Sequence, residues 1–155
     1  MRIEGSFHVA APRERVYAEI TNPALMAGCI PGCEAIEVID PKTYRARILV
    51  EVGPIKARFN LVVEITSEEP PARVLCVTRG EEGSRASMLS ANSELLLAAT
   101  DSGGTEVKYA SDVSVTGRLG KFGLGIMKKK AESLGAKFAE TFRSKIYKFS
   151  EIHKK

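Results

Sequence analysis

The chain has 155 residues, 44% of them apolar, and a net charge of +4, which fits one domain with a sizeable core and leaves no room for a second. The charged start at Arg2 and Glu4 is unlike a signal peptide, and no apolar run approaches the roughly 18 residues of a membrane span. The three cysteines are an odd number, which argues against a disulfide framework and for reduced thiols. Together these features predict a single cytoplasmic domain over residues 1–155.

Alternating side chains at residues 2–9 are the first structural signal in chain order. Ile3, Phe7 and Val9 share one side of an extended chain, and charged or polar residues occupy the other side. This period of two is typical of a strand that is buried on one face only. The sequence therefore begins with a predicted half-buried strand.

Two short helices are predicted between the first and second strands. Pro12 suits a first helical turn, and Val16 and Ile20, four residues apart, form the apolar stripe of a helix that ends before residue 22. Asn22 can then cap a second helix, which has Pro23 at its first position and continues to about residue 28.

The stretch CIPGCE at residues 29–34 raises the question of a dithiol or metal site. Its three-residue gap differs from the two-residue gap of most redox dithiols and zinc knuckles. A zinc site would need two further ligands, yet Cys76 is alone, His8 lies on a polar strand face and His153 is near the chain end. We therefore interpret Pro31-Gly32 as a turn into the second strand and the thiols as small buried hydrophobes, with no metal.

The alternation returns after this stretch and continues for most of the central chain. Apolar residues alternate on both sides of Gly53-Pro54, which predicts a hairpin with a tight turn. Further turn signals at residues 69–71, 80–83 and 101–104 separate the later strands. The predicted strands after the cysteine stretch cover residues 44–52, 55–66, 73–80, 86–99 and 105–116, in a consecutive antiparallel sheet.

A glycine-rich run at residues 117–125 leads into the last element. Its spacing does not match a phosphate-binding loop, so the glycines are interpreted as a turn from the last strand into a long helix. We predict this helix from about Leu119 to Phe149, about 45 Å long and able to cross the whole sheet. Its apolar residues recur at helical spacings: Ile126, Met127, Leu134, Phe138, Phe142, Ile146 and Phe149.

The basic charge is concentrated in this last segment. Residues 1–117 contain 12 basic and 16 acidic residues, whereas residues 118–155 contain 11 basic and 3 acidic ones. Such a field favours an anionic surface, and we expect weak peripheral contact with the inner face of the membrane or with an acidic protein, with nucleic acid the least expected partner. A solvated helix face remains the equal alternative. The predicted surface-binding residues are Lys128, Lys129, Lys130 and Lys137.

Two of these stretches, CIPGCE at residues 29–34 and GPIKARF at residues 53–59, resemble the carbon monoxide dehydrogenase G-subunit family. The resemblance covers nearly the whole chain and implies the START-like (SRPBCC) helix-grip fold. In that α+β fold, a curved antiparallel sheet of about seven strands wraps around a long C-terminal helix, with a ligand cavity between them. The resemblance also implies an accessory role to a molybdenum hydroxylase, in assembly, recruitment or electron transfer, and a lipophilic ligand such as a quinone or isoprenoid.

The expected site is a cavity that holds this ligand without catalysing a reaction and without a covalently bound cofactor. No catalytic residue is predicted. Some helix-grip relatives are polyketide cyclases or hydrolases, and Tyr44, Tyr109 and Ser111 face inward, so a cavity enzyme is the alternative if an acid-base residue converges on them. The predicted cavity residues are Phe59, Leu61, Tyr109, Ser111, Phe122, Ile126, Met127, Leu134 and Phe138.

Overall fold

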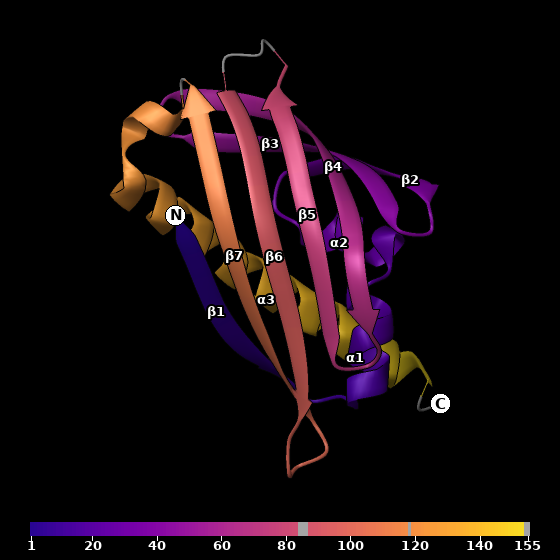
Figure 1. Ribbon diagram of the computed structural model, residues 1–155. Helices are drawn as coiled ribbons and strands as arrows, with labels where there is room; N and C mark the ends of the chain where they lie inside the picture. Colours follow the sequence, from indigo (N-terminus) through magenta and orange to yellow (C-terminus); the bar gives the residue numbers. More distant parts are fainter. Residues whose placement is uncertain (84–86, 118, 154–155) are drawn as a thin grey trace.

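The computed structural model describes residues 1–83, 87–117 and 119–153. One curved antiparallel sheet of seven strands lies across a long helix, α3, and two short helices lie near one end of that helix (Figure 1). The strands are β1 (Arg2–Val9), β2 (Cys33–Asp40), β3 (Thr43–Val52), β4 (Ile55–Glu69), β5 (Arg73–Glu82), β6 (Ser87–Ala99) and β7 (Thr105–Gly117). The helices are α1 (Arg13–Ile20), α2 (Pro23–Cys29), the 3-10 turn η1 (Leu119–Phe122) and α3 (Leu124–His153).

The strand order confirms the predicted fold class. Strands β2 to β7 pair with their sequence neighbours, and β1 pairs with β7, so the order across the sheet is β1-β7-β6-β5-β4-β3-β2. The alternation that predicted the strands is also what divides the two faces: inward residues of β4, such as Ala57, Phe59 and Leu61, are buried, and their neighbours are exposed.

The two short helices lie where their sequence signals predicted, except that Pro12 is the extended N-cap residue before α1 and that α2 ends at Cys29. Val16 and Ile20 are buried, and the Asn22 side chain accepts a hydrogen bond from the Ala24 backbone N–H at 3.0 Å, with Pro23 at the first position of α2. This cap satisfies one of the free N–H groups at the start of the helix. Local chemistry therefore decides the path between β1 and β2.

The last helix begins later in the chain than predicted. The predicted helix from residue 119 is interrupted, because Leu119–Phe122 forms a 3-10 turn and α3 begins only at Leu124. Gly123 has a φ of +85°, which a right-handed helix does not allow, so it separates the two segments. The Ser87 hydroxyl accepts a hydrogen bond from the Leu119 backbone N–H at 3.0 Å and fixes the turn against β6.

The inward side chains form two separate cores. The helix core joins β1, β6 and β7 to the three α-helices: Phe7, Val9, Ala11, Val16, Ile20, Cys29, Leu97, Val107, Ala139, Phe142 and Ile146. The hairpin core joins the β3–β4 hairpin to the 3-10 turn: Val52, Ala57, Phe59, Leu61 and Leu119. The space between these cores is where the candidate site lies.

Candidate functional site

A cavity of about 410 Å³ lies between the sheet and the helices. Its wall includes residues of all seven strands and of α1, α2 and α3; Phe7 belongs to the helix core and Leu61 to the hairpin core. The volume is within the roughly 300 to 1,000 Å³ of small-molecule sites. The curvature of the sheet therefore leaves a space of ligand size that the two cores do not fill.

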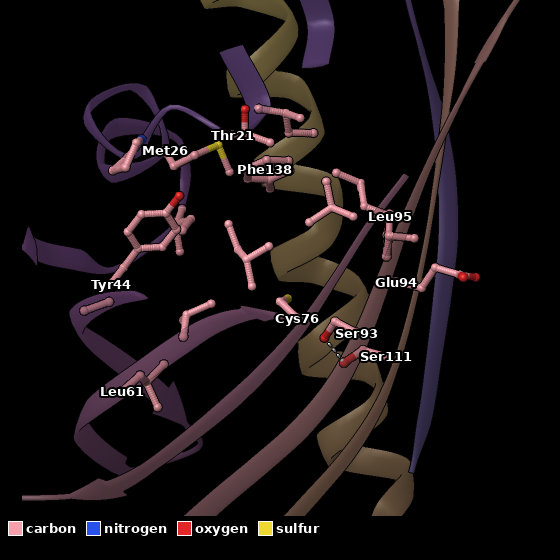
Figure 2. Close-up of a pocket in the computed structure, with 18 of the residues that line it drawn as sticks. Thr21, Met26, Tyr44, Leu61, Cys76, Ser93, Glu94, Leu95, Ser111 and Phe138 are labelled. Carbon is pink, nitrogen blue, oxygen red and sulfur yellow. Dashed lines mark hydrogen bonds between the residues drawn. The ribbon is translucent and has the colours of Figure 1, made fainter. Parts of the chain in front are cut away.

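Most of the wall is apolar. The rings of Phe7 and Phe138 meet edge to face with centroids 6.3 Å apart, and Met26, Leu61 and Leu95 extend into the same space from α2, β4 and β6 (Figure 2). Side chains of this kind offer a ligand dispersion contacts and no charge. Such a wall favours a lipophilic molecule.

A small polar group interrupts the apolar wall on β5, β6 and β7. The hydroxyl oxygens of Ser93 and Ser111 are 2.7 Å apart and share a hydrogen bond (Figure 2). Cys76 lies directly opposite Ser93 in the β5–β6 register, and all three residues line the cavity. Burial raises the pKa of the Cys76 thiol, and a hydrogen bond with Ser93 opposes this shift only in part. The thiol therefore remains protonated near neutral pH.

Tyr44 is a second polar group, on the opposite side of the cavity from the serine pair in Figure 2. Burial raises the pKa of the Tyr44 phenol, and the nearby Glu68 carboxylate and Cys76 raise it further. The Thr21 hydroxyl, also in the wall, donates to the Tyr17 carbonyl oxygen at 2.7 Å. Tyr44 is thus a neutral phenol available for hydrogen bonding.

Tyr109 occupies space that two glycines leave open. It faces Gly5 across the β1–β7 ladder, and its hydroxyl also lies under Gly135 of α3. A Cβ atom at Gly135 would be only 2.6 Å from the Tyr109 hydroxyl oxygen, and one at Gly5 would collide with the same atom. The absence of both Cβ atoms therefore lets the tyrosine ring lie between β1 and α3 and leaves the cavity open beside it.

Glu94 is adjacent to the cavity, but its carboxylate is not part of the interior. The side chain points away from the cavity in Figure 2, and Arg73 binds it with an Nη2 to Oε2 distance of 2.8 Å. The remaining wall residues among the described ones include no histidine, aspartate, lysine or arginine. The acid-base group that would favour the cavity-enzyme alternative is therefore not found among the described wall residues.

Four of the predicted cavity residues line the cavity: Leu61, Tyr109, Ser111 and Phe138. The periods of their strands and helix predicted that these four side chains face inward, and each of them is found in the cavity wall. Their role in ligand binding stays a prediction.

The other predicted cavity residues lie elsewhere. Phe59 shares the inward face with Leu61, but it is one step closer to the hairpin end, where Leu119 covers it in the hairpin core. Met127 packs against the same core. The side chain of Ile126 is 52% exposed, because sixteen residues separate it from Phe142, which places the two about 160° apart around the helix.

Leu134 is half-buried and lies at the side of α3, about 80° around the helix from Phe142. It is therefore a flanking residue and not a wall residue. The side chain of Phe122 lies outside the described part of the structure. Of the cavity residues predicted on α3, Ile126 and Leu134 therefore do not line the cavity.

The cavity also contains residues that the sequence reasoning missed. Cys76 and Ser93 line it from the centre of β5 and β6, and Met26 lines it from α2. Both strand residues lie on the inward side of an alternating stretch, so alternation was the signal that could have identified them. Their inclusion depends on the cross-strand register, which a single sequence does not specify.

The two cysteines of the CIPGCE stretch at residues 29–34 are buried to different degrees. Cys29 is 2% exposed within the helix core, Cys33 is half-buried, and burial raises the pKa of both thiols. Gly32 has a φ of +79°, as expected for the turn into β2. No group of three or more His, Cys, Asp or Glu side chains within the described residues could hold a metal ion.

The basic residues of α3 are only partly as predicted. Lys128, Lys129 and Lys137 are exposed, whereas Lys130 is half-buried. Among the described residues, no helix is long and apolar enough to cross a membrane.

Comparisons with known proteins agree with this architecture. The family model for the G-subunit of carbon monoxide dehydrogenase (CoxG) matches residues 5–147. Among curated proteins, none matches this sequence significantly.

Several solved structures are similar along nearly the whole chain. A conserved protein from Geobacillus kaustophilus is 22% identical with a TM-score of 0.88, and the match covers 96% of both chains. A START superfamily protein from Mycobacterium smegmatis is 12% identical with a TM-score of 0.75, over 96% of this chain and 98% of that one. The Zhui aromatase/cyclase from a Streptomyces species is 17% identical with a TM-score of 0.66, over 94% and 92%. At these identities the likeness establishes the fold.

Proposed function

The chain belongs to the carbon monoxide dehydrogenase G-subunit (CoxG) family and has a START-like helix-grip fold, and from this premise we propose that it is a noncatalytic binding module for a lipophilic small molecule. The ligand class is a quinone or an isoprenoid-like molecule, held in the cavity between the sheet and α3. The protein supplies the binding site, and any redox chemistry takes place in a partner enzyme.

One observation carries this proposal: a cavity of about 410 Å³ whose wall is apolar except for a few neutral hydrogen-bonding groups. Transfer of apolar surface from water into such a wall is favourable by roughly 25 cal/mol per Å². The Ser93–Ser111 pair and the Tyr44 phenol supply directional contacts without charge. The same composition is a poor environment for acid-base catalysis, because the carboxylate beside it, Glu94, is bound to Arg73 outside the cavity.

The partner in this proposal is a molybdenum hydroxylase of the carbon monoxide dehydrogenase type, which the family name supports. The module would assist its assembly, its recruitment to the membrane or its electron transfer. A cytoplasmic location with weak contact at the inner membrane surface fits the exposed Lys128, Lys129 and Lys137. Affinity purification of the chain from its own host, followed by identification of molybdenum-containing partners, tests this part separately from ligand binding.

Native mass spectrometry of the protein purified from its own host tests the ligand proposal. We expect a noncovalent lipophilic adduct that dissociates on collisional activation. Ala46 is buried and lines the cavity, so Ala46→Phe should fill part of the space and abolish the adduct. Ala98→Phe is the matched control, because Ala98 is exposed on β6. An adduct retained by Ala46→Phe and lost by Ala98→Phe would contradict the proposal.

A further inference from the structure

The polar group of the cavity wall is made by three neighbouring strands at one level of the sheet. Cys76 of β5 is directly opposite Ser93 of β6, and Ser93 is directly opposite Ser111 of β7. Two residues along the strands from this level, Val74 of β5 faces Leu95 of β6. Both side chains line the cavity and are apolar. The cavity is therefore asymmetric, with one small hydrogen-bonding region in an otherwise apolar wall.

The protons of this group can be counted. Each serine hydroxyl has one proton, and one of the two protons is used in the 2.7 Å bond between Ser93 and Ser111. The second proton remains for a third acceptor. With Ser111 as the donor in that bond, the free proton is that of Ser93, and its acceptor in the wall is the sulfur of Cys76, which is a weak one. An oxygen atom of a bound ligand would be a better acceptor for the same proton.

The charge of the interior is also defined. Burial raises the pKa of the Cys76 thiol and of the Tyr44 phenol, so both are neutral near pH 7. The carboxylate of Glu94 and the guanidinium of Arg73 neutralise each other on the other face of the sheet. An ionised ligand would lose its hydration in this cavity and find no opposite charge among the described wall residues.

Building on the proposed function, we propose that the cavity selects an uncharged ligand that places an acceptor oxygen, such as a carbonyl, against the Ser93–Ser111 pair, and that it rejects carboxylates of the same shape. Fatty acids and aromatic acids are then excluded, and ketones, esters and quinone-like carbonyl compounds are favoured. A ring with a short side chain fits within about 410 Å³, so a long isoprenoid tail would extend out of the cavity.

Three probes of nearly equal shape test the selection: 2-acetylnaphthalene, 2-naphthoate and 2-ethylnaphthalene. They carry a neutral acceptor oxygen, a negative charge and no oxygen, respectively. Isothermal titration calorimetry at pH 7 on the ligand-free full chain measures their affinities. We expect the ketone to bind about three- to tenfold more tightly than the ethyl compound, as one hydrogen bond allows. The carboxylate should bind at least about tenfold more weakly than the ketone.

Serine variants test which residues are responsible. The double variant Ser93→Ala with Ser111→Ala should reduce the affinity for the ketone to that for 2-ethylnaphthalene, and leave the latter unchanged. Ser90 and Ser114 are a matched control, because they face each other across the same two strands but are exposed. Their double alanine variant should retain the preference for the ketone. If the double alanine variant has a reduced melting temperature, the double variant Ser93→Cys with Ser111→Cys provides the same readout, because a thiol is only a weak hydrogen-bond donor.

The outcomes separate this proposal from the one on which it rests. Failure of all three probes to bind would contradict the binding function itself. Equal affinity for the ketone and the carboxylate would keep the cavity as a binding site and overturn its selectivity for neutral ligands. An undiminished preference for the ketone in the Ser93 and Ser111 variants would overturn the assignment to the serine pair.

Discussion

The two halves of α3 meet the sheet in different ways. In the C-terminal half, Ala139, Phe142 and Ile146 are buried in the helix core, and Phe142 is 0% exposed. In the N-terminal half, Ile126 and Lys129 are exposed, and Leu134 is only half-buried. One helix therefore anchors the fold at one end and borders the cavity near its middle. A helix can thus be stabilised by part of its length while another part leaves space for a ligand.

The anchor has a definite set of contacts. The rings of Phe138 and Phe142 are stacked with centroids 5.8 Å apart, and Phe7 meets Phe142 edge to face at 6.2 Å. An Arg15 Nη2 atom donates to the Ile146 carbonyl oxygen at 2.8 Å and ties α1 to the same part of α3. At the level of the cavity these contacts are replaced by Gly135, which accommodates Tyr109 and adds no side chain of its own.

The largest expected effect is at the anchor. Phe142→Ala should lower the free energy of unfolding by about 3 to 5 kcal/mol, because it removes a fully buried ring from a packed core. Leu134→Ala in the other half should cost about 1 kcal/mol, because that side chain is only half-buried. Urea unfolding of both variants measures the difference. Equal losses would show that the two halves of α3 are packed alike.

A smaller effect is expected at the glycine beside the cavity. Gly135→Ala places a Cβ against the Tyr109 hydroxyl and should destabilise the protein by about 1 to 3 kcal/mol, despite the better helix propensity of alanine. Tyr109→Phe removes the oxygen in question, so the double variant should recover most of the loss. Gly125→Ala is the control in the same helix, since nothing lies within 4 Å of its Cβ position. A double-mutant cycle with no coupling would contradict this account of Tyr109.

A third effect concerns the surface of the N-terminal half. We expect the chain to bind anionic vesicles weakly and more strongly than neutral ones, since each lysine near such a membrane contributes about 1 kcal/mol at most. Substitution of Lys128, Lys129 and Lys130 by glutamate should reduce this binding at least about tenfold, and moderate salt should release the wild type. Vesicle cosedimentation measures both. Equal binding to neutral and anionic vesicles would identify the lysines as a solvated helix face.

The smallest effect is expected for the cysteine stretch next to the anchor. Paired replacement of Cys29 and Cys33 by alanine should cost about 1 kcal/mol, nearly all of it from Cys29 in the helix core, and should leave ligand binding unchanged. Thermal melts of the two single variants separate the contributions, and titration with 2-acetylnaphthalene checks binding. Loss of binding, or a stoichiometric metal in the wild type, would overturn the structural role of the thiols.

The strands and the short helices could be predicted from the chain because their signals are local, and the helix-grip fold class was implied by the family resemblance. The alternation along β1 and β4, the Asn22 cap and the turn at Gly53 each depend on neighbouring residues and on backbone geometry alone. The interruption of the last helix at Gly123 was not predicted, because a glycine adopts either sign of φ and its neighbours do not specify which.

The contents of the cavity were predictable only in part. The periodicity of the strands and the last helix predicted inward-facing side chains, and four of these line the cavity: Leu61, Tyr109, Ser111 and Phe138. The same periodicity also selected Phe59, which is buried in the hairpin core instead.

The sequence by itself determined which residues face inward, because a side chain's direction follows from the period of its own strand or helix. Only the tertiary structure decided which inward residues fill a core and which line a space. That choice depends on sheet curvature, cross-strand register and the contact of α3 with β1, which join residues far apart in the chain. Cys76, Ser93 and Ser111 show the difference: each has an ordinary inward position, and the register of three strands makes them one polar group.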